Sequence, residues 1–204
     1  MVLKQAASID ADSKSARTRL RILDAAAEVL SARGYAGMRL SDVAEKAEVQ
    51  APAIYYYFAS REDLIEEVMY AGIAQMREHL AAALDALPDG TPPLERLTVA
   101  VEEHLRHELE LSNYATAAIR NAGQVPETIR HRNTEEQRAY GEIWAHLLKS
   151  AHEAGELRDG IDLHMAQMLV IGALNWTGEW WDPQRGNIEA LVSNAKSFVL
   201  NGLT

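Results

Sequence analysis

The chain has no cysteine, which excludes a disulfide framework and every reaction that needs a thiolate. It also lacks an apolar run long enough to cross a bilayer, and residues 1–12 carry no apolar core of the kind that a secretory signal has. We therefore expect a soluble protein of the cytoplasm, with no membrane partner.

Runs of β-branched residues are missing as well, whereas alanine, leucine, glutamate and arginine dominate every segment. These four residue types favour helices over strands, although glutamate and arginine also serve as surface charges. With 48% hydrophobic and 25% charged residues in a chain of 204, the composition is that of a folded globular protein. The sequence therefore predicts an all-α fold.

Positive charge is scarce, since the formal net charge is −10, but it is unevenly distributed. Residues 1–61 hold nine basic and seven acidic residues, a net charge of +2, whereas residues 62–204 hold eleven basic and twenty-three acidic ones, a net charge of −12. This asymmetry suits a head that faces a polyanion and an acidic body that points away from it. Ordinary variation between helix surfaces would also produce it, so charge alone does not decide.

Helix signals are strong in the first sixty residues. Apolar residues three and four apart predict an amphipathic helix over about 15–33, which Gly34 ends, and a short helix over 41–47. Pro52 is tolerated only in a first helical turn, so a further helix begins at Gln50 or Ala51. Two short helices joined by a tight turn have the form of a helix-turn-helix, and we predict a three-helix head of that type followed by a helical bundle.

The second short helix has a composition suited to the major groove of DNA. Gln50 would reach base edges. Three small residues allow close approach to bases and thymine methyl groups: Ala51, Pro52 and Ala53. Ile54 and Phe58 lie four apart and are the pair that we expect to be buried.

Three successive tyrosines follow: Tyr55, Tyr56 and Tyr57. They cannot all lie on one helical face, so their hydroxyls would be available to phosphate oxygens or base edges. The alternative is a small aromatic core, because buried tyrosine is common. For any single tyrosine both interpretations stay open.

Residues 22–64 resemble the N-terminal domain of the tetracycline-repressor (TetR) family. The resemblance rests on these residues, in order and in spacing: Leu30, Gly34-Tyr35, Asp42-Val43-Ala44, Val49, Ile54 to Phe58 and Arg61 to Leu64. It implies a homodimer that binds a palindromic site in double-stranded DNA, with Gln50 to Tyr57 as the recognition helix. It also implies a set of phosphate contacts: Thr18, Tyr55, Tyr57 and Arg61.

One position departs from the family pattern. Where the family usually has threonine or serine at the start of the second helix, this chain has Arg39, followed by Leu40 and Ser41. Arg39 could replace the hydroxyl residue as a phosphate ligand, but an arginine is not expected to cap the helix.

The remainder of the chain extends the helical pattern into a body. Ser60 is placed to cap a long helix that ends before Pro88, and further helices are expected over about 93–111, 113–122, 126–154, 162–182 and 187–202. We divide the chain into a flexible arm (1–14), a DNA-binding domain (15–60) and a ligand-binding and dimerisation domain (61–204). Apolar faces for a four-helix dimer interface would come from Met168, Leu169, Ile171, Leu174, Leu191, Ala195, Phe198 and Val199.

Trp176 and Trp180 lie four apart on one predicted helix face, next to Asn175. Indole rings suit a pocket wall and a subunit interface equally well. The stretch Gly172 to Trp180 resembles that of TetR-family members that govern fatty-acid and steroid breakdown and respond to coenzyme A thioesters. The resemblance implies an acyl-CoA effector, with Asn175, Trp176 and Trp180 among its contacts.

The phosphates of coenzyme A would need cations, and the resemblance therefore directs attention to Arg120. The neighbouring candidates are Arg130, Arg132 and Arg138. Pairing of these arginines with three glutamates on solvated helix faces, Glu127, Glu135 and Glu136, is the more common arrangement. His104 and His107, beside Glu103 and Glu108, form a weak metal-site pattern without a third ligand, and we take His104 as pocket-lining.

These features predict a DNA-binding repressor controlled by a small effector such as an acyl-CoA thioester. A repressor of an efflux system that responds to drugs or dyes is the first alternative. An all-α enzyme acting on thioesters is a remote one, because we identify no catalytic residue, no metal site and no cofactor motif.

Overall fold

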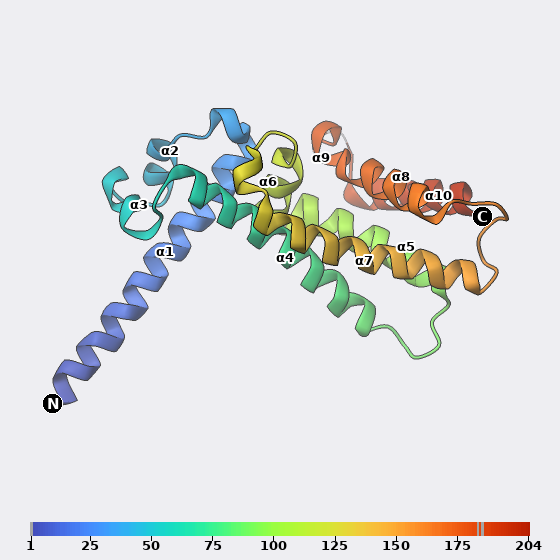
Figure 1. The fold of residues 1–204 in the computed structure, drawn as a ribbon, viewed down its shortest axis with the longest axis horizontal. Coiled ribbons are helices and arrows are strands. Elements are labelled where there is room, and N and C mark those ends of the chain that lie inside the picture. Colours follow the sequence, from blue (N-terminus) through green and yellow to red (C-terminus); the bar gives the residue numbers. More distant parts are fainter. Residues whose placement is uncertain (1, 183, 185) are drawn as a thin grey trace.

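The computed structural model describes residues 2–182, 184 and 186–204, with side chains omitted for residues 2–13 and 131. Within this part every regular element is helical (Figure 1). A head formed by the C-terminal half of α1 (Val2–Gly37) with α2 (Leu40–Lys46) and α3 (Ala51–Tyr57) precedes a larger helical body. The predicted fold class is confirmed.

The head is built around one small apolar core. Ile22 and Leu30 of α1, Val43 of α2 and Ile54 of α3 are buried together, and Phe58 closes the core just after α3. The expected buried pair is therefore confirmed. Because only one face of each short helix is used for this core, the opposite face of α3 remains available to solvent.

Local sequence signals account for the ends of these elements. Gly34 has a φ of 70° and interrupts α1, as its position after the apolar stripe predicted. Glu48, in the turn between α2 and α3, has a φ of 52°, a backbone conformation that costs a non-glycine residue about 1–2 kcal/mol. Ser60 Oγ accepts the Asp63 N–H at 3.0 Å and caps the following helix, whereas Arg39 makes no such cap for α2.

The helix α1 begins at Val2, so its first turns occupy the range 1–14 that we assigned to an arm. Met1 and the side chains of residues 2–13 lie outside the described part of the chain. The flexibility of this arm stays a prediction.

The body consists of α4 (Arg61–Asp85), α5 (Pro93–Arg106), α6 (Asn113–Asn121), α7 (His131–Glu153), α8 (Leu163–Asn175), α9 (Thr177–Trp180) and α10 (Ile188–Leu203). In Figure 1 the head lies at one end of the long axis and α8 and α10 lie at the other, with α4, α5 and α7 running between them. Helix α6 packs against both α1 and α4 and so joins the head to the body. None of the described helices is long and apolar enough to cross a membrane.

Three expected helices are each divided in the structure. The one expected over 93–111 ends in a turn of π-helix, His107–Leu111; a 3₁₀ turn, Glu127–Ile129, precedes α7; and α8 ends before Trp176, with α9 as a separate short turn. The π turn spans only five residues, too few for the period of the apolar pattern to distinguish it from an α-helix, so the sequence did not show the first division. A π turn inserts an extra residue into a helix and is often found at functional sites.

Close packing holds α6 against α4. A Cβ atom added to Gly72 of α4 would lie 2.2 Å from the Tyr114 carbonyl oxygen of α6, so only glycine allows this approach. Tyr114 also reaches the head, where its hydroxyl donates to Asp24 Oδ1 of α1 at 2.5 Å. A shift of α6 is therefore transmitted to both neighbours.

Candidate functional site

The solvent-facing side of α3 carries the residues predicted to contact DNA. Tyr56 is 81% exposed, and Gln50, Pro52 and Tyr55 are also exposed. Three residues are half-buried at its edge: Ala51, Ala53 and Tyr57. The rings of Tyr56 and Tyr57 meet edge to face with centroids 5.0 Å apart. The short helix thus presents small residues at its N-terminal turn and phenolic hydroxyls after it, which suits entry into a major groove.

Most cations of the head are engaged within the protein. Arg19 pairs with Glu67 of α4 at 2.5 Å, Arg33 pairs with Asp42, and Lys46 pairs with Glu28. Arg21 donates to the carbonyl oxygen of Ala47. The small positive charge of the head is therefore largely used for its own packing, and it offers few free charges for phosphate contacts.

Arg61 and Arg39 have different environments. Arg61 donates to the carbonyl oxygens of Tyr35 and of Met38, the latter at 3.2 Å, and its guanidinium lies over the Tyr35 ring. It therefore fastens the end of α1 and the segment after it to the start of α4, and its third nitrogen donates to Glu62 Oε1 at 3.0 Å. Arg39 is exposed and, among the described residues, has no ion-pair partner. Thr18 is half-buried, and its hydroxyl donates to the Lys14 carbonyl oxygen at 3.0 Å.

A cavity of about 280 Å³ lies in the body between α4, α6, α7 and α8. Its wall is mostly apolar, with Met76 of α4 and Ile119 of α6 among its members. A few polar groups face it: Gln137, Tyr140, Gln167 and Asn175. Concave apolar space with a small number of polar groups is the usual form of a small-molecule site.

The predicted ligand residues do not all meet at this cavity. Asn175 lines it, and His104 lies directly behind its wall, where His104 Nδ1 is 2.7 Å from the Tyr140 hydroxyl. Trp176 and Trp180 are exposed and lie outside the lining. Trp176 and Trp180 therefore do not form the wall of this cavity.

Arg120 has a structural environment different from the expected phosphate site. Its Nε lies 2.9 Å from Glu179 Oε1 of α9, and the same guanidinium donates to the Ser31 carbonyl oxygen of α1 at 2.8 Å. The next residue, Asn121, is fully buried and accepts the Tyr35 N–H at 2.6 Å. Consecutive residues at the end of α6 thus connect α9 to the last turn of α1.

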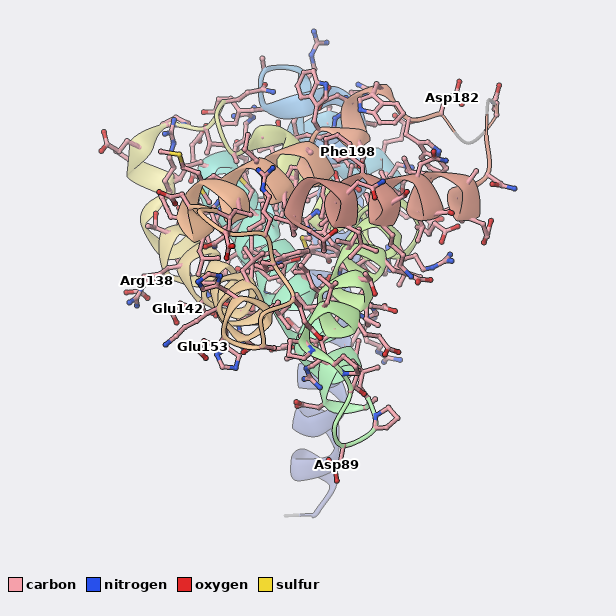
Figure 2. The ribbon with its side chains drawn as sticks, turned by 90° about the vertical axis from the view of Figure 1, so that its right-hand side faces the viewer. Asp89, Arg138, Glu142, Glu153, Asp182 and Phe198 are labelled. Atoms are coloured by element: carbon pink, nitrogen blue, oxygen red, sulfur yellow. The ribbon has the colours of Figure 1, made fainter. Side chains whose placement is uncertain are left out.

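The remaining arginines are partly engaged. Arg130 donates to the Val125 carbonyl oxygen at 2.8 Å, Arg132 lies 4.0 Å over the Tyr70 ring, and Arg138 pairs loosely with Glu142 at 3.7 Å. Figure 2 shows Arg138 and Glu142 on the outside of α7. Arg138 thus pairs with a glutamate on a solvated face, but its partner is Glu142 and none of the three glutamates predicted from the sequence.

Among the described residues, no three histidine, cysteine or acidic side chains are placed to hold a metal ion. His104 and His107 are both buried but have separate contacts: His104 lies beside Tyr140 and Trp144, and His107 stacks on His79 with centroids 4.7 Å apart. Burial and the two neighbouring histidines lower the pKa of His107 to about 4, so the ring is neutral near pH 7.

Comparison with known families decides the identity of this architecture. Residues 90–203 match the tetracyclin repressor-like C-terminal domain, and residues 22–68 match the bacterial regulatory proteins of the tetR family. The chain belongs to the tetracycline-repressor family. As a member of the TetR family it is a DNA-binding transcriptional regulator, and its head and body have the places that the sequence predicted.

Curated relatives align with the TetR-family chain along nearly its whole length. The fatty acid metabolism regulator protein of Bacillus subtilis is 23% identical over 186 residues, covering 90% of this chain and 94% of that protein. The transcriptional repressor KstR2 of Mycolicibacterium smegmatis is 25% identical over 203 residues, covering 96% and 95%.

Solved structures share the fold. AibR in complex with isovaleryl coenzyme A and operator DNA has a TM-score of 0.79 at 17% identity, covering 89% of this chain and 97% of that one. FadR from Bacillus subtilis in complex with stearoyl-CoA has a TM-score of 0.74 at 23% identity, covering 91% and 99%.

An apolar face lies at the α8 and α10 end of the TetR-family body. Leu169 is 73% and Phe198 71% exposed, and Met165 and Met168 are exposed beside them. Figure 2 looks onto this end and labels Phe198. Two of the residues expected in a dimer interface, Leu174 and Val199, are instead buried within the chain, because they point from α8 and α10 into the core of the body.

Several important residues were not identified as site residues from the sequence. Asn121 and Tyr140 carry no motif, and their roles depend on contacts between helices distant in sequence. Glu108 was noted only as a neighbour of the histidines, yet it is 1% exposed. The signal that could have identified it was its place on the apolar side of a predicted helix, where a glutamate is expected to be buried.

Proposed function

We propose that this TetR-family chain is a homodimeric repressor of the bacterial cytoplasm that leaves a palindromic operator when an acyl-CoA thioester occupies the cavity between α4, α6, α7 and α8. The observation that carries the proposal is the double role of α6. Ala118, Ile119 and Ala122 line the cavity, while Arg120 and Asn121, between them in sequence, bind the end of α1.

This arrangement supports a direct coupling of ligand to DNA. A ligand that enlarges the cavity displaces α6, and α6 cannot move without pulling on the Ser31 carbonyl or the Tyr35 amide. In a dimer such a displacement changes the separation of the two α3 helices, which must match half-sites one helical turn apart. The coupling free energy is then the difference between the free energies of ligand binding to the DNA-competent and the displaced positions of the head.

The class of effector is supported by the relatives. FadR from Bacillus subtilis is solved in complex with stearoyl-CoA, and AibR in complex with isovaleryl coenzyme A. The mostly apolar wall of the cavity in this chain suits an acyl group. Arg130 and Arg132 are exposed, lie in the chain between the cavity-lining residues Ala122 and Gln137, and are proposed to meet the coenzyme A phosphates.

Dimerisation through α8 and α10 is the second part of the proposal. Leu169 and Phe198 are large, apolar and exposed at one end of the body. The cavity between them, about 540 Å³, is lined mostly by apolar residues of the same two helices, with residues 158–162 at its edge. Contiguous apolar surface of this kind in a regulator marks an association site.

The test uses duplex DNA from upstream of the gene for this chain. A footprint locates the operator, and fluorescence anisotropy at fixed salt then measures its release by acyl-CoA thioesters of increasing length, with cationic dyes in parallel. Release by thioesters at micromolar concentration supports the proposal. Release by dyes alone would instead establish a drug-responsive repressor, and hydrolysis of the thioester by purified protein would establish an enzyme.

A further inference from the structure

Behind Tyr140 lies a cluster of buried polar groups that the fold itself does not satisfy. Both carboxylate oxygens of Glu108, both ring nitrogens of His107, Nε2 of His104 and the indole Nε1 of Trp144 are inaccessible and have no hydrogen-bond partner. Each such group costs about 1–3 kcal/mol when left unpaired, so a site with several of them is unusual for a purely structural core.

The cluster lies directly behind the wall of the cavity that we assign to the effector, and Tyr140 separates the two. Tyr140 lines that cavity, and its hydroxyl contacts His104 Nδ1 at 2.7 Å. His104 Nε2, on the other edge of the ring, lies 3.5 Å from Glu108 Oε2. A ligand group that extended past the Tyr140 side chain would meet His104 first and Glu108 next.

The geometry defines the chemistry of the group that would fit. If the Tyr140 hydroxyl donates to His104 Nδ1, then Nε2 carries the proton and is a donor, whereas the carboxyl of Glu108 offers an acceptor. An oxygen about 2.8 Å from both atoms completes a triangle on the 3.5 Å side that joins them. A hydroxyl, which donates and accepts, satisfies both partners, whereas a methyl group satisfies neither.

Glu108 follows His104 by four residues, so the two side chains share one helix face and point inward together. Glu108 itself lies in the π turn His107–Leu111, and its carbonyl oxygen accepts the Thr116 hydroxyl of α6 at 2.6 Å. On its far side Glu108 abuts α9, since a Cβ atom added to Gly178 would lie 2.6 Å from Glu108 Oε1. Burial raises the pKa of Glu108, as expected for a carboxyl group in an apolar site.

We infer that Glu108 and His104 are specificity-determining residues of the effector site, and that they select a ligand whose apolar portion carries a hydroxyl group at its buried end. This inference rests on the proposed function and narrows it from acyl thioesters in general to hydroxylated ones. A saturated chain of the same length leaves the cluster unpaired and binds more weakly for that reason.

The location of Glu108 also links recognition to the head. Gly178, against which the carboxyl packs, precedes Glu179, the partner of Arg120. A ligand hydroxyl that draws Glu108 away from α9 therefore acts at the same bridge that holds the Ser31 carbonyl of α1.

The experiment uses matched pairs of acyl-CoA thioesters from octanoyl to hexadecanoyl, each with and without a hydroxyl on the terminal carbon, titrated into the full chain by calorimetry. We expect at least one hydroxylated member to bind about tenfold or more tightly than its saturated partner. In Glu108→Leu this preference disappears or reverses, whereas Glu108→Gln, which still forms hydrogen bonds, retains it.

A matched control is Glu110→Leu, on the exposed side of the same π turn, which leaves the preference unchanged. Thermal melting confirms that each variant is folded, and Glu108→Leu is expected to melt no lower than the parent because it removes an unpaired buried carboxyl group. Equal affinity for the two members of every pair, or a hydroxyl preference that persists in Glu108→Leu, overturns the inference while leaving a thioester effector in place. Failure of every thioester to bind overturns the proposed function, and this inference with it.

Discussion

At the scale of single residues, the head separates cations that hold the fold from cations that face solvent. Arg61 was predicted as a phosphate contact because of its position in the family pattern, but two of its nitrogens donate to carbonyl oxygens at the end of α1 and just after it, and the third pairs with Glu62. Arg39, which breaks the family pattern, remains exposed. A guanidinium group fits either role, and only the neighbouring backbone decides which one it has.

This separation predicts that two alanine substitutions affect different properties, operator binding for Arg39 and folding stability for Arg61. Arg39→Ala is expected to weaken operator binding and to reduce the slope of log Kd against log salt by about 0.9 per protomer, with the melting temperature unchanged. Arg61→Ala is expected to destabilise the chain by about 1–3 kcal/mol, because it removes charged hydrogen bonds to carbonyl groups. Anisotropy at several salt concentrations and urea unfolding measure the two effects, and equal salt slopes for parent and Arg39→Ala would contradict the assignment.

A second prediction at this scale concerns the loss of folding stability at low pH. The pKa of His107 is lowered to about 4, against about 6.5 in an unfolded chain, so the folded protein binds fewer protons between these values. The contribution of His107 to the free energy of unfolding is therefore fully present above about pH 6.5. It is lost as the pH falls toward 4, by at most about 1.4 kcal/mol per pH unit.

The variant His107→Phe tests this. Its free energy of unfolding should fall less steeply than that of the parent between pH 7 and pH 5. The raised pKa of Glu108 changes stability with pH in the opposite direction. Because Glu108 is present in both proteins, the difference between their pH profiles reports His107 alone. Parallel pH profiles for the two proteins would show that His107 is not titrating in this range.

At the scale of elements, α6 has a place that its sequence did not indicate. It was expected as one helix among several, yet its last residues bind α1 and α9 while its inner face lines the cavity. The sequence showed an amphipathic segment with an arginine near its end, but the partners of that arginine lie 89 and 59 residues away in the chain. Pairings at such separations depend on how the helices pack, and periodicity does not report them.

The bridge through Arg120 predicts a loss of communication rather than a loss of binding. In Arg120→Ala the operator and the effector should each still bind, but the change in operator affinity caused by effector should shrink about fivefold, which corresponds to about 1 kcal/mol of coupling. Glu179→Gln should act in the same direction. The matched control is Arg138→Ala, whose loose pair with Glu142 lies on an exposed face of α7. An undiminished effector response in Arg120→Ala would show that the signal reaches the head by another route.

At the scale of the whole molecule, an acidic body is attached to a head whose charge is mostly neutralised internally. Residues 62–204 carry a net charge of −12, so the body is repelled by DNA and α3 faces it. A single head with few free cations binds DNA weakly. The operator affinity of a regulator built this way must come from two heads that bind together. The apolar end formed by α8 and α10 is the surface that would pair them.

Charge placed on that surface should separate the subunits. Leu169→Asp combined with Phe198→Asp is expected to yield a folded monomer by analytical ultracentrifugation, with operator affinity reduced by about a hundredfold or more. Leu111→Asp, at an exposed leucine on the π turn away from that end of the body, should remain a dimer. A dimeric double variant would place the interface elsewhere on the body.

What the sequence determined by itself was local: helices from the spacing of apolar residues, the Gly34 stop, the Ser60 cap, the buried pair Ile54 and Phe58, and the family through the order of residues in the head. These signals depend on neighbours within one or two helical turns, so a single sequence contains them. The tertiary structure alone decided that Arg61 and Arg120 bind carbonyl groups, that Leu174 faces inward, and that Glu108 and His104 share a buried site behind Tyr140. Each of those outcomes depends on which helices become neighbours. Packing across the whole body decides this, and a few close contacts, such as Gly72 against Tyr114, set the positions of the other helices.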